Sequence, residues 1–440
     1  MHGLERELRR YGCYSSSSST RRGLEAVAEC LEQMTEGRAK PRLYLSSVDP
    51  GMGKTTLIRH YILSLLASSN HEGVAVLVCL SRLEEVKKMV VGLSSVLDEV
   101  AIWTGDDEIN ALSTTPRQSA RVLITTQQKL EAACRHHHRF NDIADLHYQG
   151  LPREVRIWDE SFIPGVELML SEDDLASLFG LFRRSAPKLC QALQDLRDAL
   201  KASRSGEVLE VHSLEDMGGV KGVYEVNRLL ADKCFSGTDR ERLERLQQAA
   251  GEKLPVHRNA FGSAMLLDYR ETLPQDLFPL LVLDASGRCR ETYKLMESRG
   301  DTLVRLPSAT KRYDNLSIHL WSTGSGKAAY ANDKDEVLIR GIAAQIAKRP
   351  AEDWLIIHNK TSAEDMRERL EAHLDGCMTG TLHFVTWGNH HGTNAYAHVP
   401  NVVLASLFNL PPEVHEARVR LCAAMAGDDA VSAKQINSMA

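Results

Sequence analysis

The feature that most constrains this chain is a glycine-containing loop between a short apolar run and a helical pattern. The loop is Ser47-Val48-Asp49-Pro50-Gly51-Met52-Gly53-Lys54-Thr55-Thr56. Residues 43–45 before it are apolar or aromatic, and apolar residues recur at helical spacing over 57–66 after it. Glycines let the backbone bend so that its N–H groups can surround phosphate oxygens, and the N-terminus of the following helix adds partial positive charge. This order of strand, loop and helix predicts a phosphate-binding loop.

The residue types in the loop predict ATP and Mg²⁺ as cofactors. Lys54 is expected to reach the β- and γ-phosphates, and the Thr55 hydroxyl is expected to bind the metal ion. The residues expected to contact the nucleotide here are Pro50, Gly51, Met52, Gly53, Lys54, Thr55 and Thr56. Val48 stands where the GxxxxGK[ST] pattern has its first glycine. The alternative is a glycine-rich turn without a nucleotide, and the surrounding strand and helix favour ATP.

An acidic pair follows a later apolar run. Residues 155–158 lead directly into Asp159 and Glu160. A carboxylate at the end of a strand can hold Mg²⁺, directly or through water, and the next one can orient and deprotonate the attacking water. A lone pair of this kind could be a solvated strand end, but its place after the phosphate loop favours a Walker B motif. The expected catalytic residues are therefore Lys54, Asp159 and Glu160, with Thr55 and Asp159 as Mg²⁺ ligands.

Short apolar runs alternate with helical patterns through much of the chain. They lie at 43–45, 74–80, 101–103, 122–124, 155–158 and 280–283. Several are apolar at consecutive positions, which is typical of parallel strands covered on both faces. We predict an α/β fold class, with a first domain over 41–300 that follows an N-terminal flexible and helical segment, 1–40.

Residues from about 165 to 275 break this alternation. Leucines and phenylalanines form two helical stripes there, and Ser171 and Asp174 are spaced like a capping pair. We therefore expect a helical insertion in the first domain, or a separate helical module, that could contact a protein partner. A second α/β domain is expected over 301–440. Its predicted strands are 316–320, 354–357, 382–386 and 402–404, and its predicted helices are 335–348, 362–374 and 413–426.

Charge and cysteine content exclude several classes. The net charge of −6 gives no global basic field, so any nucleic acid would be held in a local groove. The nine cysteines include no CxxC pair, which is typical of reduced thiols in the cytoplasm. No run of about 18 apolar residues exists, and the N-terminus has no apolar signal segment, so we expect no membrane association.

Taken in order, these motifs resemble those of superfamily 2 helicases of the DEAD/DEAH-like group. Asp159-Glu160-Ser161-Phe162 resembles motif II, Leu283-Asp284-Ala285-Ser286 resembles motif III, and 354–360 resembles motif IV. Residues 121–127 resemble the strand-plus-threonine segment that touches the nucleic-acid backbone, and 386–394 followed by 402–404 is similar to motif V. Helicase-like proteins of bacteriophages and integrated elements are the narrower resemblance.

The resemblance implies two RecA-like domains that bind ATP between them, with DNA or RNA as the partner. It implies an ATP-dependent helicase or translocase, and it adds Ser286, Gly392 and Asn394 to the residues expected to contact the nucleotide. The family's arginine-containing motif VI and its adenine-reading Q-motif are not visible. Arg418 and Arg420 are the nearest arginines, and they are more typical of solvated helix positions.

The missing motif keeps other expectations open. The second domain could be truncated, the arginine could come from another subunit, or hydrolysis could be weak. Two alternative functions follow: a phage terminase-like packaging ATPase, which needs three carboxylates at strand ends of the second domain, and a nucleotide-binding switch protein with weak or no hydrolysis.

Two segments imitate sites. Residues 322–328 mimic a second phosphate loop, but Ala328 lacks the hydroxyl that would bind Mg²⁺, so an ordinary loop is predicted. The run 135–139 contains three consecutive histidines, which cannot all face one ion, so a basic surface is predicted instead of a metal site. Loop polarity explains His390 and His391 nearly as well as contact with nucleic acid does.

Overall fold

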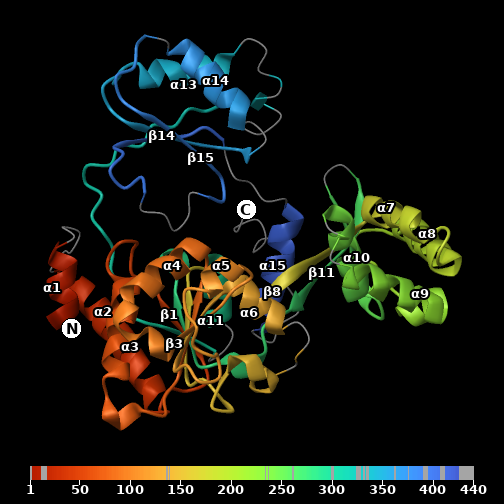
Figure 1. Ribbon diagram of the computed structural model, residues 1–440. Coiled ribbons are helices and arrows are strands. Elements are labelled where there is room, and N and C mark those ends of the chain that lie inside the picture. Colours follow the sequence, from red (N-terminus) through yellow and green to blue (C-terminus); the bar gives the residue numbers. More distant parts are fainter. Residues whose placement is uncertain are drawn as a thin grey trace. The chain divides into compact units, whose positions relative to one another are not determined.

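The computed structural model of this chain divides into two compact units, each described by itself (Figure 1). The first comprises the chain up to Lys311 together with helix α15 (Pro412–Met425), and the second is Arg312–Leu410. The residues that the structure describes are 2–10, 17–134, 137, 139–232, 234–235, 237–259, 262–298, 302–323, 329–330, 332, 336–360, 363–374, 376–389, 395–406 and 412–425.

A seven-stranded sheet forms the centre of the first unit. Its strands are β1 (Leu43–Ser46), β2 (Val76–Leu80), β3 (Val100–Trp103), β4 (Val122–Thr126), β7 (Val155–Asp159), β12 (Leu280–Leu283) and β13 (Leu303–Arg305). They are ordered β13-β1-β12-β7-β2-β4-β3, and every pairing is parallel. Six of these strands lie at the predicted apolar runs, so the predicted α/β class with parallel sheets is confirmed.

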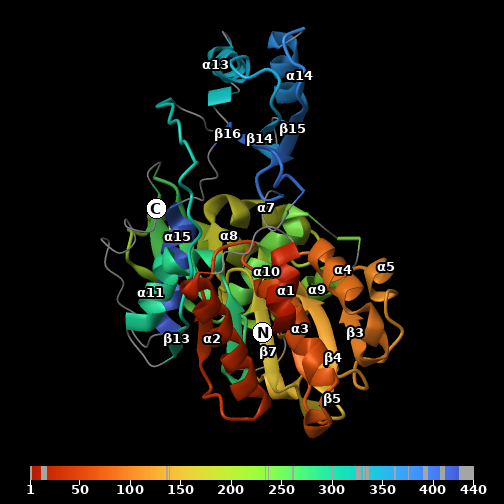
Figure 2. The same ribbon diagram turned by 90° about the vertical axis from the view of Figure 1, so that its left-hand side faces the viewer.

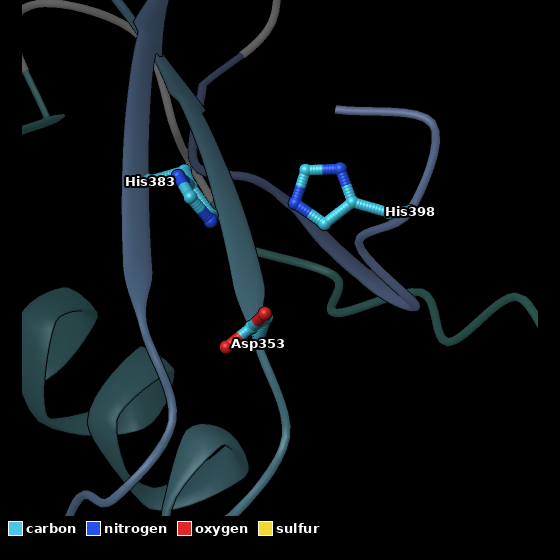
Figure 3. A group of neighbouring side chains, drawn as sticks. All are labelled: Asp353, His383 and His398. Carbon is cyan, nitrogen blue, oxygen red and sulfur yellow. The ribbon is translucent and has the colours of Figure 1, made fainter. Parts of the chain in front are cut away.

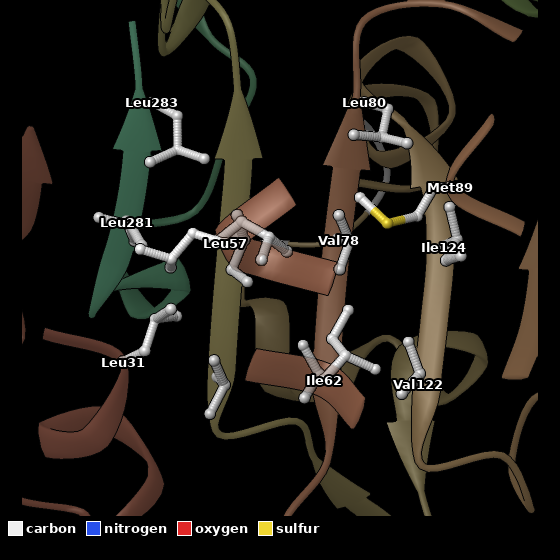
Figure 4. Close-up of a cluster of buried hydrophobic side chains, with 14 of the residues drawn as sticks. Leu31, Leu57, Ile62, Val78, Leu80, Met89, Val122, Ile124, Leu281 and Leu283 are labelled. Carbon is white, nitrogen blue, oxygen red and sulfur yellow. The ribbon is translucent and has the colours of Figure 1, made fainter. Parts of the chain in front are cut away.

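Helices cover both faces of this sheet, which explains why its strands are apolar on consecutive residues (Figure 2). Helices α2 (Ser18–Thr35), α3 (Lys54–Leu66) and α4 (Leu83–Gly92) pack on one face, and α6 (Gln127–Cys134), α11 (Glu291–Ser298) and α15 on the other. Figure 4 shows Leu57 and Ile62 of α3 among side chains from β12, β2 and β4. Each such buried side chain contributes about 1.5–3 kcal/mol, so this packing holds the start of α3 against the sheet.

Shorter elements complete the first unit. They are α1 (His2–Arg10), α5 (Asp107–Asn110), β5 (His147–Tyr148), β6 (Leu151–Pro152) and the 3-10 helices Ser69–His71, Ser94–Glu99, Phe140–Asp142, Ala144–Leu146, Gln275–Leu277 and Ala285–Arg288. Strands β5 and β6 form a small antiparallel hairpin before β7. Across the described part of the chain, no helix combines the length and the apolar character needed to cross a membrane.

The insertion between β7 and β12 contains the predicted helices together with an antiparallel sheet that the sequence did not predict. Its elements are β8 (Gly165–Ser171), α7 (Glu172–Phe182), α8 (Pro187–Ala202), β9 (Val208–Glu210), α9 (Leu214–Ala231), α10 (Thr238–Ala249), β10 (Lys253–Arg258) and β11 (Ala264–Glu271). The strands pair antiparallel in the order β8-β11-β10-β9. The leucine stripes lie on α7 and α8, whereas β8 buries only alternate residues, Leu168 and Leu170, over a short stretch. The predicted capping box of Ser171 and Asp174 is confirmed at the start of α7.

The second unit has a three-stranded parallel sheet in the order β15-β14-β16. Its elements are α13 (Val337–Ile346), β14 (Trp354–His358), α14 (Ala363–His373), β15 (Leu382–Thr386) and β16 (Asn401–Leu404). The predicted strand at 316–320 is wrong: these residues form no strand, and Leu320 is 93% exposed. Alternation of apolar and polar residues is typical of a strand with one covered face, but no strand among the described residues pairs with this segment.

The helix predicted at 413–426 exists as α15, and it packs with the first unit. Val419 and Cys422 are buried in the same cluster as β1 and β12 residues, and Arg418 pairs with Glu167 of β8. The second compact unit, 312–410, is therefore shorter than the predicted second domain, 301–440. The difference arises because α15 buries its apolar face against the sheet of the first unit.

Candidate nucleotide-binding site

The loop between β1 and α3 has the backbone shape that its glycines allow. Gly51 and Gly53 adopt φ angles of 69° and 98°, in the left-handed region that side chains with a β-carbon disfavour. Helix α3 begins at Lys54, and its N-cap Gly53 offers no side chain to bond the first N–H groups. Those N–H groups are therefore available to an anionic ligand, as at other helix N-termini.

Lys54 lies inside the curve of this loop. Its Nζ donates to the carbonyl oxygens of Val48 at 2.5 Å and Asp49 at 3.3 Å. Burial lowers the pKa of Lys54, and the nearby acids Asp159 and Glu160 oppose that shift. The ammonium group is thus close both to the loop backbone and to the acidic pair predicted from the sequence.

The strand order explains how the loop and the acidic pair meet. Strand β12 lies between β1 and β7, so the loop after β1 and the acids after β7 emerge at the same carboxyl edge of the sheet. Two parallel strands separated by one other are about 10 Å apart, a gap that side chains from both sides can bridge. The two sides are close enough that Lys54 and the Thr55 side chain both act on the Asp159 carboxyl group and lower its pKa.

Acids outnumber the lysine in this site. Burial, together with Glu160 and Glu85, raises the pKa of Asp159 to about 7, although Lys54 and Thr55 act in the opposite direction. Burial also raises the pKa of Glu160. The site is therefore short of positive charge, and a hydroxyl next to a carboxylate is a donor set that fits Mg²⁺.

Glu160 has a strained backbone that holds it at the strand end. Its φ is 79°, which is uncommon for a residue with a side chain, and its N–H donates to the Leu283 carbonyl at 3.2 Å. On the other side, Gln127 Nε2 at the start of α6 donates to the Asp159 carbonyl at 2.5 Å. Bonds from β12 on one side and from the start of α6 on the other thus fix the direction of the acidic pair.

The end of β12 carries a second hydrogen-bond network. Asp284 is 1% exposed and accepts from Ser286 Oγ at 2.6 Å and from the Tyr293 hydroxyl at 3.0 Å. That hydroxyl accepts from the Phe162 N–H at 2.8 Å, and Arg290 lies 3.6 Å from the Asp284 carboxylate. A chain of bonds therefore joins the segment after the acidic pair to the end of β12.

A third network fastens the phosphate loop itself. The buried Asp49 carboxylate accepts from Arg288 Nη2 at 2.5 Å and from the Lys311 N–H at 2.7 Å. Arg288 also donates to the Ser47 carbonyl at 2.5 Å. A β-carbon built on Gly51 would lie 2.9 Å from Lys311 Nζ, so this second ammonium lies beside the loop.

Helix α1 packs against the same loop. A β-carbon on Gly53 would lie 2.6 Å from a methyl carbon of Leu8, and Leu8 is buried. Glu7 pairs with Arg59 and with His60, both on α3. Burial alone would raise the pKa of Glu7, but these two partners lower it below its ordinary value. The N-terminal helix is therefore part of the surroundings of the site.

The structure brings together Lys54, Thr55, Asp159 and Glu160, as expected from their order in the sequence. Ser286 bonds Asp284 and Arg290, and its expected contact with nucleotide stays a prediction. Gly392 and Asn394 lie outside the described residues, as do His390, His391, most of the histidine run and residues 324–328. Arg418 pairs with Glu167, and Arg420 pairs with Glu416.

The segment 121–127 is bonded internally. Arg121 is 5% exposed and donates to the backbone carbonyls of Leu65, His71 and Val74. The Thr125 hydroxyl donates to the Trp103 carbonyl at 2.6 Å. These bonds connect β4 to its neighbours. Arg121 and Thr125 therefore stabilise the fold, whereas the sequence predicted that their segment touches nucleic acid.

Sequence reasoning missed several charged residues of the site: Glu85, Arg288, Arg290 and Lys311. A weak signal was present for two of them, because Arg288 and Arg290 follow closely after the acid that ends β12. Lys311 carries no local signal, since only the path of the chain after β13 brings it beside the loop.

No protein-family model matches this sequence, and no curated protein matches it either. Among solved structures, Xpd4 from S. tokodaii is similar at 13% identity and a TM-score of 0.47, covering 95% of this chain and 89% of that one. Dbp5 from S. cerevisiae, bound to RNA and ADP BeF3, is similar at 11% identity and a TM-score of 0.34, covering 92% and 84%. A hypothetical ATP-dependent RNA helicase from Sulfolobus tokodaii has 10% identity and a TM-score of 0.27, covering 97% and 93%. These identities and TM-scores are low, so the α/β fold class is established by the parallel pairing of the strands in this chain and not by the similar structures.

Proposed function

We propose that this chain is a nucleic-acid-stimulated ATPase of the superfamily 2 helicase type. The observation that carries the proposal is the strand order β1-β12-β7, which places the buried Lys54 and the acids Asp159 and Glu160 at one carboxyl edge of a parallel sheet. These groups come from two loops at one edge of a parallel sheet, where such folds bind their ligands. The ordered sequence motifs support helicase or translocase as the finer class.

Each residue has a distinct role in this proposal. Lys54 and the loop N–H groups bind the phosphates, and Thr55 and Asp159 hold Mg²⁺. Bound Mg²⁺-ATP supplies the γ-phosphoryl group and the positive charge that neutralises it. Glu160 orients the attacking water and accepts its proton, and its raised pKa makes it a stronger base than an ordinary glutamate.

The experiment is an ATPase assay with and without single-stranded DNA or RNA. Wild-type turnover is expected to rise when nucleic acid is added, and Lys54→Ala and Glu160→Gln are expected to abolish it. Matched controls are Lys88→Ala on α4 and Glu108→Gln on α5, both exposed, which should leave turnover unchanged. Retained turnover in either site variant would remove the assignment.

The same assays distinguish the two alternatives. Metal-dependent cleavage of a plasmid would indicate a packaging ATPase, whose nuclease needs three carboxylates in the second domain. In the described part of the second unit, the group of neighbouring metal-ligating side chains has one carboxylate and two histidines, which does not favour that alternative. Tight ATP binding without turnover would indicate a nucleotide-dependent switch protein.

A further inference from the structure

Three side chains from separate segments meet at one end of the sheet in the second unit. They are Asp353 just before β14, His383 on β15 and His398 in the turn before β16 (Figure 3). Each offers one ligand atom, and these atoms all lie within 4.8 Å of one another. Two imidazoles and one carboxylate at this spacing could bind a single ion.

The hydrogen bonds of the group leave ligand atoms available. His383 Nε2 is buried, and within the described residues it has no hydrogen-bond partner, which is costly for a polar atom. One oxygen of Asp353 accepts from the Thr381 N–H at 2.7 Å, which fixes the direction of the carboxylate. A buried nitrogen without a partner and an oriented carboxylate are what a metal site needs before its ion binds.

The parallel pairing explains why residues so far apart in the sequence converge. Trp354 lies opposite both Leu382 and Asn401, so the starts of the three strands lie side by side. Asp353 and His383 are next to this level, and His398 reaches it from the turn that enters β16. The opposite end of the sheet holds His358 and Thr386, where the segment that resembles motif V begins, and it lies about 13 Å away along β14.

We propose that Asp353, His383 and His398 bind a Zn²⁺ ion. Two imidazoles and one carboxylate favour zinc and similar transition metals over Mg²⁺ or Ca²⁺, which prefer oxygen ligands. Because His398 is exposed, a water molecule can complete the coordination. The ion would fasten the turn before β16 to β14 and β15, which is a structural role that does not depend on the proposed ATPase activity.

The test is Zn²⁺ and Co²⁺ titration of the full chain after treatment with a chelator. The expected result is one Zn²⁺ per chain at this site, and Co²⁺ absorption bands in the visible typical of low coordination number. His398→Gln should weaken binding by at least about tenfold and remove the bands. The exposed position of His398 means that this variant keeps the packing of the sheet, and Asp353→Asn and His383→Gln should give the same loss.

Two controls exclude other histidines. His319→Gln changes an exposed histidine of the same unit and should leave binding unchanged. A variant with His136, His137 and His138 all changed to Gln removes the histidine run and should keep the Co²⁺ spectrum. The inference is overturned if Zn²⁺ does not bind, if His398→Gln and His383→Gln bind it like the wild type, or if only the triple variant loses it.

Discussion

The proposed nucleotide site and the proposed zinc site use opposite ends of the strands in their parallel sheets. In the first unit the important side chains follow the carboxyl ends of β1, β7 and β12, where loops lead into helix N-termini. In the second unit the three side chains lie at the amino ends of the strands: Asp353 before β14, His383 near the start of β15 and His398 before β16. The first site crowds buried acids around one lysine, whereas the second combines two imidazoles with one carboxylate.

This difference indicates two kinds of ligand. Lys54 and the open N–H groups at the start of α3 suit phosphates, while the surplus of acids suits a cation that arrives together with them. Asp353, His383 and His398 in the second unit include no lysine and no helix N-terminus that could bind an anion in the same way. We therefore expect the first site to exchange its ligand in each cycle and the second to retain its ion.

The largest expected effect is on catalysis and tests the role of Glu160. Glu160→Gln keeps the size of the side chain but cannot accept a proton, so turnover should fall by about 10²–10⁴-fold. ATP affinity should change little, because the phosphate-binding groups remain. Steady-state turnover and nucleotide binding by fluorescence measure the two quantities, and equal losses in both would contradict the role of proton acceptor.

The surplus of acids also predicts how stability depends on pH. The pKa of Asp159 is raised from 3.8 to about 7, so the folded chain binds this proton more tightly than the unfolded chain between those values. Wild-type stability should therefore decrease as the pH rises from about 4 to about 7 through this group. Without Mg²⁺, Asp159→Asn should be more stable than the wild type by about 2–4 kcal/mol at pH 8.

The advantage of Asp159→Asn should shrink steadily below pH 7 and vanish below about pH 4, where both states of the wild type are protonated. Urea unfolding at several pH values measures it. A pH-independent difference would mean that packing, not charge, distinguishes the two side chains. Glu108→Gln, an exposed acid, is the matched control and should show no such trend.

The network around Asp49 predicts a smaller effect that links loop and helix. Arg288→Ala leaves the buried Asp49 carboxylate with the Lys311 N–H as its remaining donor among the described residues, and it should cost about 1–3 kcal/mol of stability. The KM for ATP should rise because the phosphate loop is less firmly held. Arg288→Lys should recover part of the stability but not the paired bonds to Asp49 and Ser47. An unchanged KM in Arg288→Ala would show that the loop keeps its shape without this arginine.

The smallest expected effect sharpens the contrast between the two units. Zn²⁺ at ten times its Kd should stabilise the folded second unit by about 1.4 kcal/mol and raise its unfolding temperature. ATP turnover at a fixed Mg²⁺ concentration should not change when Zn²⁺ is removed with a selective chelator. Differential scanning calorimetry and the ATPase assay test both statements, and a loss of turnover on zinc removal would break the comparison.

The two sites differ equally in how far the sequence could predict them. The closeness of Lys54, Thr55 and Asp159 could be expected because each belongs to a contiguous motif with a recognisable strand before it. Asp353, His383 and His398 belong to no such motif, and only the pairing of β14 with β15 and β16 brings them together. Arg288 and Lys311 were missed for the same reason, since their partner Asp49 is distant in the sequence.

Prediction of the fold succeeded where burial imposed one pattern over a whole strand. Six of the seven strands of the central sheet were visible as runs of mostly apolar residues, because helices cover both faces of the sheet, whereas β13 was not predicted. Strand β10 in the insertion buries Leu254 and Val256 but not Pro255 between them. Two buried residues are too short a pattern to recognise beside the longer helical patterns of the insertion. At 316–320 a strand was predicted where the structure has none. The alternating pattern was present, but a sequence pattern cannot show whether a partner strand exists.

The return of α15 to the first unit changes what a single cut in the backbone would do. The polypeptide leaves the first unit after Lys311 and comes back to it at α15, so two covalent crossings tether the second unit. A protease that nicks only one crossing would produce two bands on a denaturing gel while the native particle stayed whole. For the same reason, residues 312–410 form a cassette that could be excised and replaced by a short linker without removing either end of the first unit.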